Sequence, residues 1–327
     1  MIISRTPFRI SFFGGGTDYP QWFRRHGGAV LSTSFDKYSY ITCRPLPPFF
    51  DHKYRITYSR LEHVKDLEEF GHPAVRAVLR ELGIQEGLEM HCDADLPARS
   101  GLGSSSSFVV GLLHTLRAYE GRRVSRQWLA QEAARIEQEV LAENVGSQDQ
   151  VAAAFGGFNL IRFLEDGSFA VEPVPLHGER KSELNRHLML FFTGFSRIAS
   201  EVAKSKIANF DRKAQDMHAL RAMVDEAMSI LCSDADIRKF GELLHETWER
   251  KRLLSDKVST EHIDALYGRA RAAGAIGGKL LGAGGGGFML LFVEPDFQAG
   301  VRQALGELIH VPFQFESAGS RIIYYEP

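Results

Sequence analysis

A loop rich in glycine and serine that runs directly into an apolar helical pattern is the feature that most constrains this chain. The segment 96–107 reads LPARSGLGSSSS, and FVVGLLHTLRAY follows it. Phe108, Leu112 and Leu116 fall on one stripe at helical spacing, so we expect a helix over 104–119 with the serines in its first turn. Glycines let backbone N–H groups approach an anion, and a helix N-terminus carries positive partial charge. The segment therefore predicts a phosphate-binding loop.

The same composition is also found in flexible connections between elements. The loop taken alone leaves both interpretations open. The strong helical pattern behind it favours phosphate binding, because serine hydroxyls in a first helical turn can bind phosphate oxygens or a Mg²⁺ that accompanies them.

Composition indicates a globular protein with one large or two medium domains. The chain has 327 residues, of which 44% are hydrophobic and 24% charged, a balance that supports a sizeable core. A formal net charge of −2 gives no reason to expect nucleic acid or an anionic membrane as a partner. The first residues lack a signal-peptide pattern, and the longest apolar runs are too short to span a bilayer. We therefore expect a cytoplasmic protein.

The cysteines do not point to a metal site. Cys43, Cys92 and Cys232 are scattered without metal-binding spacing, and three cysteines cannot all pair within one chain. Buried or incidental thiols are the simpler interpretation.

The order of the expected elements favours an α+β fold, with strands dominating the first half and helices the second. In the first half we expect strands over 2–13, 28–44, 54–58 and 88–95, helices over 73–82, 104–119 and 125–143, a loop over 146–158 and a hairpin from 158–163 and 169–174. In the second half we expect a strand over 187–194, helices near 197–208, 211–231, 234–253, 259–272 and 296–308, and strands over 288–293, 312–316 and 321–325. The polar run HGERKSE predicts a domain boundary near residue 180, which divides the chain into 1–180 and 181–327.

Two further glycine clusters lie at 14–16 and 282–287. The second of these formally matches the dinucleotide pattern G-x-G-x-x-G, but the strand-like run FMLLFV follows it where a nucleotide fold requires a helix. The hypothesis that the chain is a nicotinamide-dependent oxidoreductase rests on that match alone. The chain has no G-x-x-x-x-G-K-[ST] motif, which excludes the usual P-loop.

Three segments together resemble the motifs of the GHMP kinases, and they occur in the order found in that family. They are TPFRISFFGGGTDY at 6–19, PARSGLGSS at 97–105 and KLLGAGGGG at 279–287. The resemblance implies a two-domain α+β fold, with an N-terminal domain like ribosomal S5 domain 2 and a ferredoxin-like C-terminal domain. The N-terminal domain would carry the ATP loop and the catalytic aspartate. The resemblance also implies ATP and Mg²⁺ as cofactors.

The resemblance assigns ATP binding to the loop, through Pro97, Arg99, Ser100, Gly101, Leu102, Gly103, Ser104, Ser105, Ser106 and Ser107. Ser105 is the expected Mg²⁺ ligand, with Ser104 and Ser106 as competitors in the run of four serines. Glu137 is its expected carboxylate partner, and Glu139 is the neighbour that could be confused with it. A solvated helix carboxylate is the alternative for Glu137.

The same resemblance makes Asp149, in the segment GSQDQ, the candidate catalytic residue. It would accept the proton of the acceptor hydroxyl or orient that hydroxyl for in-line attack. Arg9 would lie beside it and counter developing negative charge. Without the family, an ordinary turn aspartate and a strand-edge arginine would be the simpler interpretations.

The acceptor is expected to contact Gly14, Gly15, Gly16, Thr17, Asp18, Thr193, Arg197, Gly284 and Gly285. Asp18 resembles the family aspartate that receives sugar hydroxyls. Arg197 is the first candidate for a phosphate already on the substrate, and Lys279 is a weaker one, because a guanidinium suits phosphate. A solvated arginine at a helix start remains the alternative for Arg197.

Within the family, GGGTDYP and GSQDQVAAAFGGFN look most like the kinases of D-glycero-D-manno-heptose 7-phosphate. Galactokinases carry Glu-His where this chain has Gly15–Gly16, which argues against galactose. The resemblance therefore implies transfer from ATP to the anomeric hydroxyl of that heptose phosphate, with a homodimer possible. The alternatives are a kinase of fucose, galactose or mannose and a catalytically silent nucleotide-binding regulator.

Overall fold

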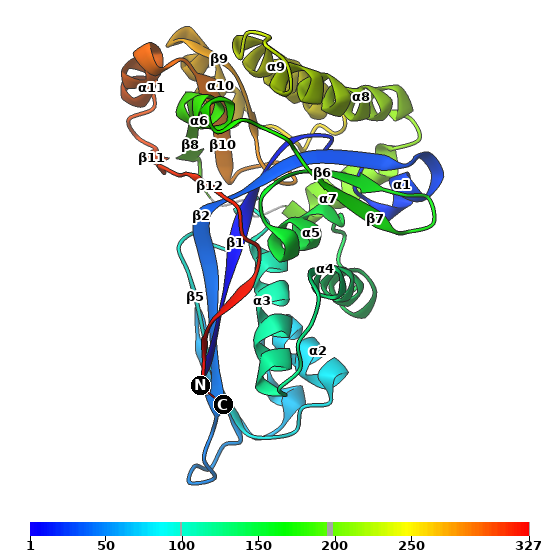
Figure 1. The fold of residues 1–327 in the computed structure, drawn as a ribbon, viewed down its shortest axis with the longest axis vertical. Helices are drawn as coiled ribbons and strands as arrows, with labels where there is room; N and C mark the ends of the chain where they lie inside the picture. The colour runs from blue at the N-terminus through cyan, green and yellow to red at the C-terminus, as the bar shows by residue number, and fades with distance from the viewer. Residues whose placement is uncertain (99, 195–198, 327) are drawn as a thin grey trace.

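A large, strongly bent β-sheet is built mainly from the first half of the chain, with two strands from its end. The computed structural model describes residues 1–98, 100–194 and 199–326. The strands of this sheet are β1 (Ile2–Phe13), β2 (Gly28–Pro45), β3 (Tyr54–Thr57), β4 (Leu61–Val64), β5 (Leu88–Ala94), β6 (Phe158–Phe163), β7 (Phe169–Pro173), β12 (Phe315–Glu316) and β13 (Arg321–Tyr325). Their main order is β13-β1-β2-β5-β3-β4. The long strand β2 pairs with β6 over its first part and with β5 over its second part, so it connects both ends of the sheet (Figure 1).

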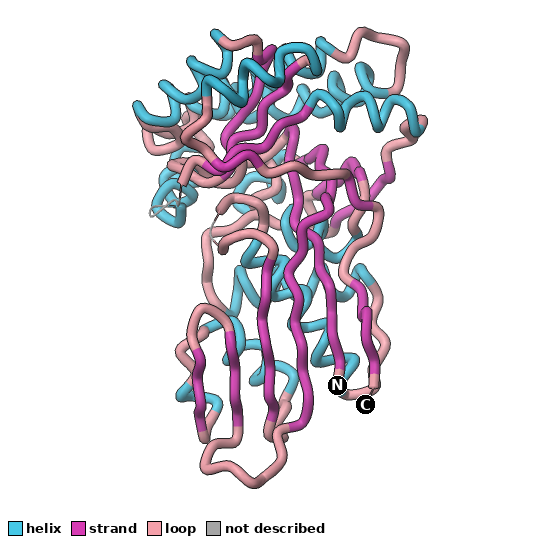
Figure 2. Tube along the Cα trace, turned by 90° about the vertical axis from the view of Figure 1, so that its left-hand side faces the viewer, coloured by secondary structure: helices cyan, strands magenta, loops and turns pink. Residues whose placement is uncertain are grey.

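Helices α2 (Pro73–Leu82), α3 (Ser104–Tyr119), α4 (Arg126–Arg135) and α5 (Gln148–Phe155) cover one face of this sheet. Figures 1 and 2 show them on the same side of β1, β2 and β5. Helix α3 lies against β1 and β2 through fully buried side chains that include Val109, Leu112 and Leu116. Burial of that apolar stripe fixes where the first turn of α3 and the preceding loop lie.

The second half of the chain builds a four-stranded sheet in the order β11-β8-β10-β9. Its strands are β8 (Leu188–Phe192), β9 (Ala275–Leu280), β10 (Phe288–Val293) and β11 (Ile309–His310), and its helices are α6 (Gly178–His187), α7 (Ala199–Asn209), α8 (Ala214–Leu231), α9 (Arg238–Arg252), α10 (Glu261–Ala272) and α11 (Gln298–Ala304). A short helix α1 (Pro20–His26) follows β1. Strand β13 returns to the first sheet and pairs with β1, so the two termini lie close together (Figure 2).

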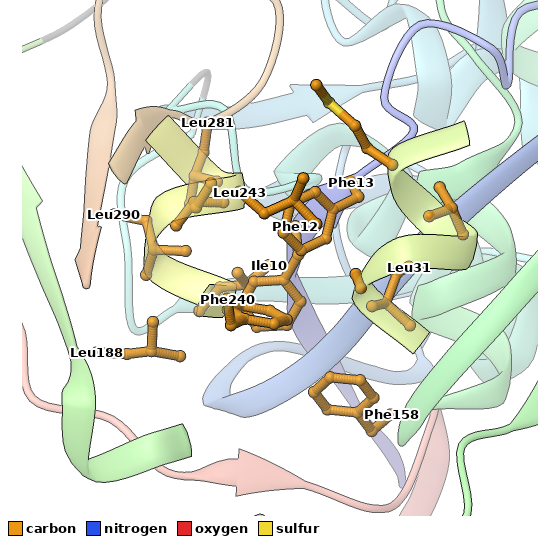
Figure 3. Close-up of a cluster of buried hydrophobic side chains, with 14 of the residues drawn as sticks. Ile10, Phe12, Phe13, Leu31, Phe158, Leu188, Phe240, Leu243, Leu281 and Leu290 are labelled. Carbon is orange, nitrogen blue, oxygen red and sulfur yellow. The ribbon is translucent and has the colours of Figure 1, made fainter. Parts of the chain in front are cut away.

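One hydrophobic core joins the two sheets. Figure 3 shows Phe12 of β1 facing Phe240 of α9, with Leu290 of β10 beside them. The ring centroid of Phe12 lies 5.4 Å from that of Phe240 and 5.5 Å from that of Phe158 in β6. Because Phe12 and Phe240 are fully buried, the end of β1 is held firmly against the second half of the chain.

The α+β class is confirmed, and several elements have the predicted bounds, among them the helices over 73–82 and 104–119 and the strand over 321–325. The loop predicted over 146–158 is wrong, because 148–155 forms helix α5. Its run of alanines carries no apolar–polar periodicity, yet Ala152, Ala153 and Ala154 are buried against neighbouring elements. The sequence patterns also do not predict helices α1 and α6 or strands β4 and β9.

The helix predicted over 125–143 begins as expected, because the Ser125 hydroxyl accepts a hydrogen bond from the Trp128 N–H and caps α4. It changes at Ile136 into a π-helical turn over Ile136–Val140. The division of the chain near residue 180 stays a prediction. Among the described residues, no helix is long and apolar enough to cross a membrane.

Candidate functional site

A bidentate ion pair between Arg9 and Asp149 forms the centre of the candidate site. Arg9 Nε donates to Asp149 Oδ1 at 2.7 Å, and Nη2 donates to Oδ2 at 2.8 Å. Arg9 Nη1 donates to the carbonyl oxygen of Gly101 at 2.8 Å. One guanidinium therefore joins strand β1, the first turn of α5 and the glycine–serine loop. The Arg9 side chain is 4% exposed and that of Asp149 is 24% exposed, so the carboxylate is the accessible partner.

The glycine–serine loop packs directly on the glycine segment that follows β9. Gly101 has a positive φ of 83°, and a Cβ there would lie 2.6 Å from the carbonyl oxygen of Leu281. A Cβ on Gly282 would lie 2.4 Å from the Cα of Gly101. Only glycines permit this backbone contact, so the second and third motifs meet without intervening side chains.

The serines of the loop have different partners. Ser100 Oγ donates to the carbonyl of Pro97 at 2.7 Å and Ser107 Oγ to that of Pro7 at 2.9 Å, so both hydroxyls hold the loop in place. Ser106 is buried, and its Oγ donates to Glu137 Oε2 at 2.7 Å. Ser105 is exposed at the start of α3, and its hydroxyl also stabilises the Glu137 carboxylate. Leu102 is fully buried in the core, and its carbonyl accepts from the Arg9 N–H.

Glu137 is fully buried in the π-helical turn, which turns its carboxylate toward the first turn of α3. Its Oε2 also accepts a hydrogen bond from Gln150 Nε2 at 2.5 Å. Its Oε1 has no hydrogen-bond partner among the described residues. Burial raises the pKa of Glu137 to about 7, although the serine and amide donors oppose that shift. A buried, half-satisfied carboxylate beside two serine hydroxyls has the hard oxygen donors that Mg²⁺ prefers.

The turn after β1 places Asp18 in the interior. Its Oδ1 accepts the Gly16 N–H at 2.8 Å, and its backbone carbonyl accepts the Ser147 N–H at 2.9 Å. Burial and the nearby Asp149 raise the pKa of Asp18, while the Gly16 N–H and Lys206 lower it. Asp18 therefore lies close enough to Asp149 for the two side chains to interact electrostatically.

Thr17 and Gly15 belong to the same turn after β1. The Thr17 hydroxyl bridges the Gly14 and Ala29 carbonyls at 2.8 and 3.0 Å, so it stabilises the turn. Gly15 lies between the Ser11 hydroxyl and the Gln148 side chain. Ser11 Oγ and Gln148 Oε1 are buried and have no hydrogen-bond partner within the described part of the chain, so both could receive ligand hydroxyls.

The remaining expected acceptor contacts lie around the third motif. Thr193 Oγ1 donates to the Gly287 carbonyl at 3.0 Å, which ties the end of β8 to that segment. Gly284 and Gly285 pack against the backbone of Val258, whose carbonyl accepts the Gly285 N–H at 3.0 Å. Arg99 and Arg197 lie outside the described residues.

Three buried lysines from the second half of the chain surround the pair, and two of them were not singled out from the sequence. Lys279 Nζ donates to the Phe12 carbonyl at 2.7 Å, and Lys251 Nζ donates to the carbonyls of Leu280 and Gly282 at 2.8 and 2.7 Å. Lys206 of α7 is 4% exposed and interacts electrostatically with Asp18 and Asp149. Burial is the main cause that lowers the pKa of each lysine, to about 7 for Lys279 and about 8 for Lys206.

A lysine on an apolar face is the signal that could have identified Lys206. It follows the buried Val202 by one helical turn and is itself buried, whereas Lys204 on the same helix is exposed. A cation at such a position is costly without a partner, so it points to a function.

No group of three or more histidine, cysteine or carboxylate side chains that could hold a metal is found in the ranges described. A hollow of about 450 Å³ between α8 and α9 is lined by residues such as Glu226, Lys239 and Glu246. None of the residues described above lines it, so it is separate from the candidate site. The Arg9–Asp149 pair, the loop at a helix N-terminus and the buried carboxylates instead suit the positioning of a phosphate donor and a hydroxyl acceptor.

Two family models match the chain. The model of the GHMP kinase N-terminal domain matches residues 68–157, and the model of the GHMP kinase C-terminal domain matches residues 213–309. The chain belongs to the GHMP kinase family. Kinases of this family use ATP as the phosphate donor, so the activity of the chain is that of an ATP-dependent kinase.

Relatives match this kinase over most of its length. The D-glycero-alpha-D-manno-heptose 7-phosphate kinase of Campylobacter jejuni is 29% identical over 315 residues, 93% of each chain. A galactokinase of Thermococcus kodakarensis is 26% identical over 88% of each chain. A crystal structure of a D-glycero-D-manno-heptose 1-phosphate kinase from Bacteroides thetaiotaomicron, 25% identical, covers both chains fully with a TM-score of 0.81. The two-domain kinase fold expected from the motifs is therefore confirmed.

Gly146 offers a test of the Asp18 environment. A Cβ at this position would lie 1.9 Å from Asp18 Oδ2, so Gly146→Ala must displace the carboxylate. We expect at least a tenfold loss of kcat/KM for the acceptor, with the dissociation constant of ADP unchanged, in steady-state kinetics and calorimetry. Gly268→Ala, where no atom lies within 4 Å of the added Cβ, is the control. Wild-type kinetics in Gly146→Ala would contradict a role for Asp18 in acceptor binding.

Proposed function

We propose that this chain is a sugar kinase that transfers the γ-phosphoryl group of ATP to the anomeric hydroxyl of D-glycero-D-manno-heptose 7-phosphate, giving the 1,7-bisphosphate. The observation that carries the catalytic part is the Arg9–Asp149 pair anchored to the Gly101 carbonyl. The substrate part is supported by the heptose phosphate kinases among the relatives and by the GGGTDYP segment. We expect the enzyme to act in the cytoplasm.

The loop over 97–107 would hold the phosphates of ATP. Its glycines leave backbone N–H groups open to phosphate oxygens, and the 16-residue helix α3 adds the positive end of its dipole. The contact between Gly101 and Gly282 would keep the loop rigid while the phosphates are bound.

Asp149 would receive the acceptor hydroxyl. Because Arg9 occupies one side of each carboxylate oxygen, the remaining lone pairs can accept the hydroxyl proton and orient the oxygen toward phosphorus. The guanidinium donates to the Gly101 carbonyl and so lies close to the loop, where negative charge would accumulate during transfer. Asp18, Ser11 and Gln148 would contact other hydroxyls of the sugar.

Glu137, Ser105 and Ser106 are the residues that would hold Mg²⁺. The unpartnered Oε1 of Glu137 and the adjacent hydroxyls fit a hard cation. A bound Mg²⁺ would neutralise phosphate charge on ATP. Ser106 donates directly to Glu137, and Ser105 is the more exposed of the two serines.

A panel of acceptors tests the proposed substrate. ADP release is measured with D-glycero-D-manno-heptose 7-phosphate, the corresponding 1-phosphate, and unphosphorylated heptose, fucose, galactose and mannose. We expect the highest kcat/KM with the 7-phosphate and a product phosphorylated at the anomeric carbon. Activity confined to an unphosphorylated sugar would overturn the heptose assignment and leave the kinase intact.

Asp149→Asn tests the catalytic role. The amide cannot accept the hydroxyl proton as the carboxylate does, so we expect kcat to fall by at least about 100-fold while ADP binding stays within twofold. Asp166→Asn, in the exposed turn of the β6–β7 hairpin, is the control. Unchanged turnover in Asp149→Asn would refute the assignment.

Glu137→Gln tests the proposed metal site. The folded-state pKa of about 7 lies above the usual value of 4.5, so above pH 7 the ionised carboxylate costs stability, and the amide removes that cost. At pH 8 we expect an equal or higher Tm together with a kcat at least about tenfold lower and a higher Mg²⁺ concentration for half-maximal activity. Glu139 is an exposed residue of the same turn, so Glu139→Gln should leave the Tm, kcat and Mg²⁺ dependence unchanged. An unaltered Mg²⁺ dependence in Glu137→Gln would contradict the site.

A further inference from the structure

Lys206 differs from the other buried lysines near Asp149 because it has no hydrogen-bond acceptor among the residues that the structure describes. Lys251 and Lys279 donate to backbone carbonyls at 2.7–2.8 Å. These bonds hold neighbouring segments together, so a structural role explains why both lysines are buried. The ammonium of Lys206 donates no hydrogen bond to any residue that the structure describes, although the residue is 4% exposed. An ammonium has three donors, and burying them without acceptors is strongly unfavourable.

The surroundings of Lys206 direct its charge toward the reacting region. Its ammonium interacts electrostatically with Asp18 and Asp149, the two carboxylates assigned to the acceptor side. The Tyr19 ring lies 5.6 Å from Lys206 Nζ and closes one side of the ammonium. Val202 and Ala203 on the same helix are buried, so packing of α7 fixes the direction of the lysine side chain.

Arg9 is already committed to three hydrogen bonds, two to Asp149 and one to Gly101. Lys251 and Lys279 are committed to carbonyls. Within the described residues, Lys206 is therefore the cation of this cluster that spends none of its donors on the protein.

We propose that Lys206 is a further catalytic residue, which binds the acceptor oxygen and the oxygens of the transferred phosphoryl group from the α7 side of the site. This inference rests on the proposed kinase function but not on the identity of the sugar. The acceptor oxygen forms a bond to the γ-phosphorus, its proton passes to Asp149, and the bond from phosphorus to the β–γ bridging oxygen breaks with its electron pair leaving on ADP. Lys206 keeps its protons throughout and donates hydrogen bonds to the oxygens on which negative charge accumulates.

The test compares Lys206→Met with Lys204→Met on the acceptor that the wild-type enzyme prefers. Methionine keeps the length and apolar stem of the lysine while removing the charge, and Lys204 lies exposed on the same helix. We expect Lys206→Met to lower kcat by at least about 100-fold, with the KM for ATP and the dissociation constant of ADP within threefold. Lys204→Met should match the wild type. Lys206→Arg, which retains a cation, should recover at least tenfold of the lost kcat.

The possible outcomes separate this inference from the proposed function. If Lys206→Met keeps the wild-type kcat while Asp149→Asn loses turnover, the role of Lys206 is overturned and the kinase assignment stays in place. A loss of kcat accompanied by an equal loss of ADP affinity, without recovery in Lys206→Arg, would show a structural role and also overturn it. Absence of transfer by the wild-type enzyme to every sugar tested would overturn both. Lys206→Gln, measured in parallel, serves if the methionine variant does not fold.

Discussion

The bidentate bond from Arg9 to Asp149 is the interaction on which the rest of the candidate site depends. Arg9 lies on β1, where that strand pairs with β2, and its guanidinium reaches both α5 and the glycine–serine loop. A planar guanidinium can bond a carboxylate and a carbonyl at once in fixed directions, which an ammonium cannot do. The glycine–serine loop and the Asp149 carboxylate are therefore positioned by one rigid side chain.

The second half of the chain contributes to the same region through backbone contacts. The Gly101–Gly282 contact brings the third motif against the loop, and Lys279 and Lys251 fix that segment by donating to carbonyls. The shared core around Phe12 and Phe240 makes the arrangement rigid, since both rings are fully buried between the two sheets. The site thus combines residues from both sheets, and Lys206 extends this pattern to α7.

The sequence predicted the parts of the site whose signal is local. The loop and its helix could be predicted from the spacing of Phe108, Leu112 and Leu116 behind the glycines. The family resemblance then pointed to Arg9, Asp18, Glu137 and Asp149. The structure brings Arg9 and Asp149 into direct contact and places Glu137 beside the serines of α3. Helix α5 was missed because its alanines give no amphipathic pattern. Lys206 and Lys251 were missed because their burial depends on packing between distant segments.

The most direct test of this account is a double-mutant cycle on kcat with Arg9→Met, Asp149→Asn and the double variant. If the two side chains act as one unit that positions the acceptor and the loop, the double variant should be about as slow as the slower single variant, because either change already disables the pair. If the two effects on kcat instead multiply, Arg9 and Asp149 contribute independently, and the central role given to their contact is wrong.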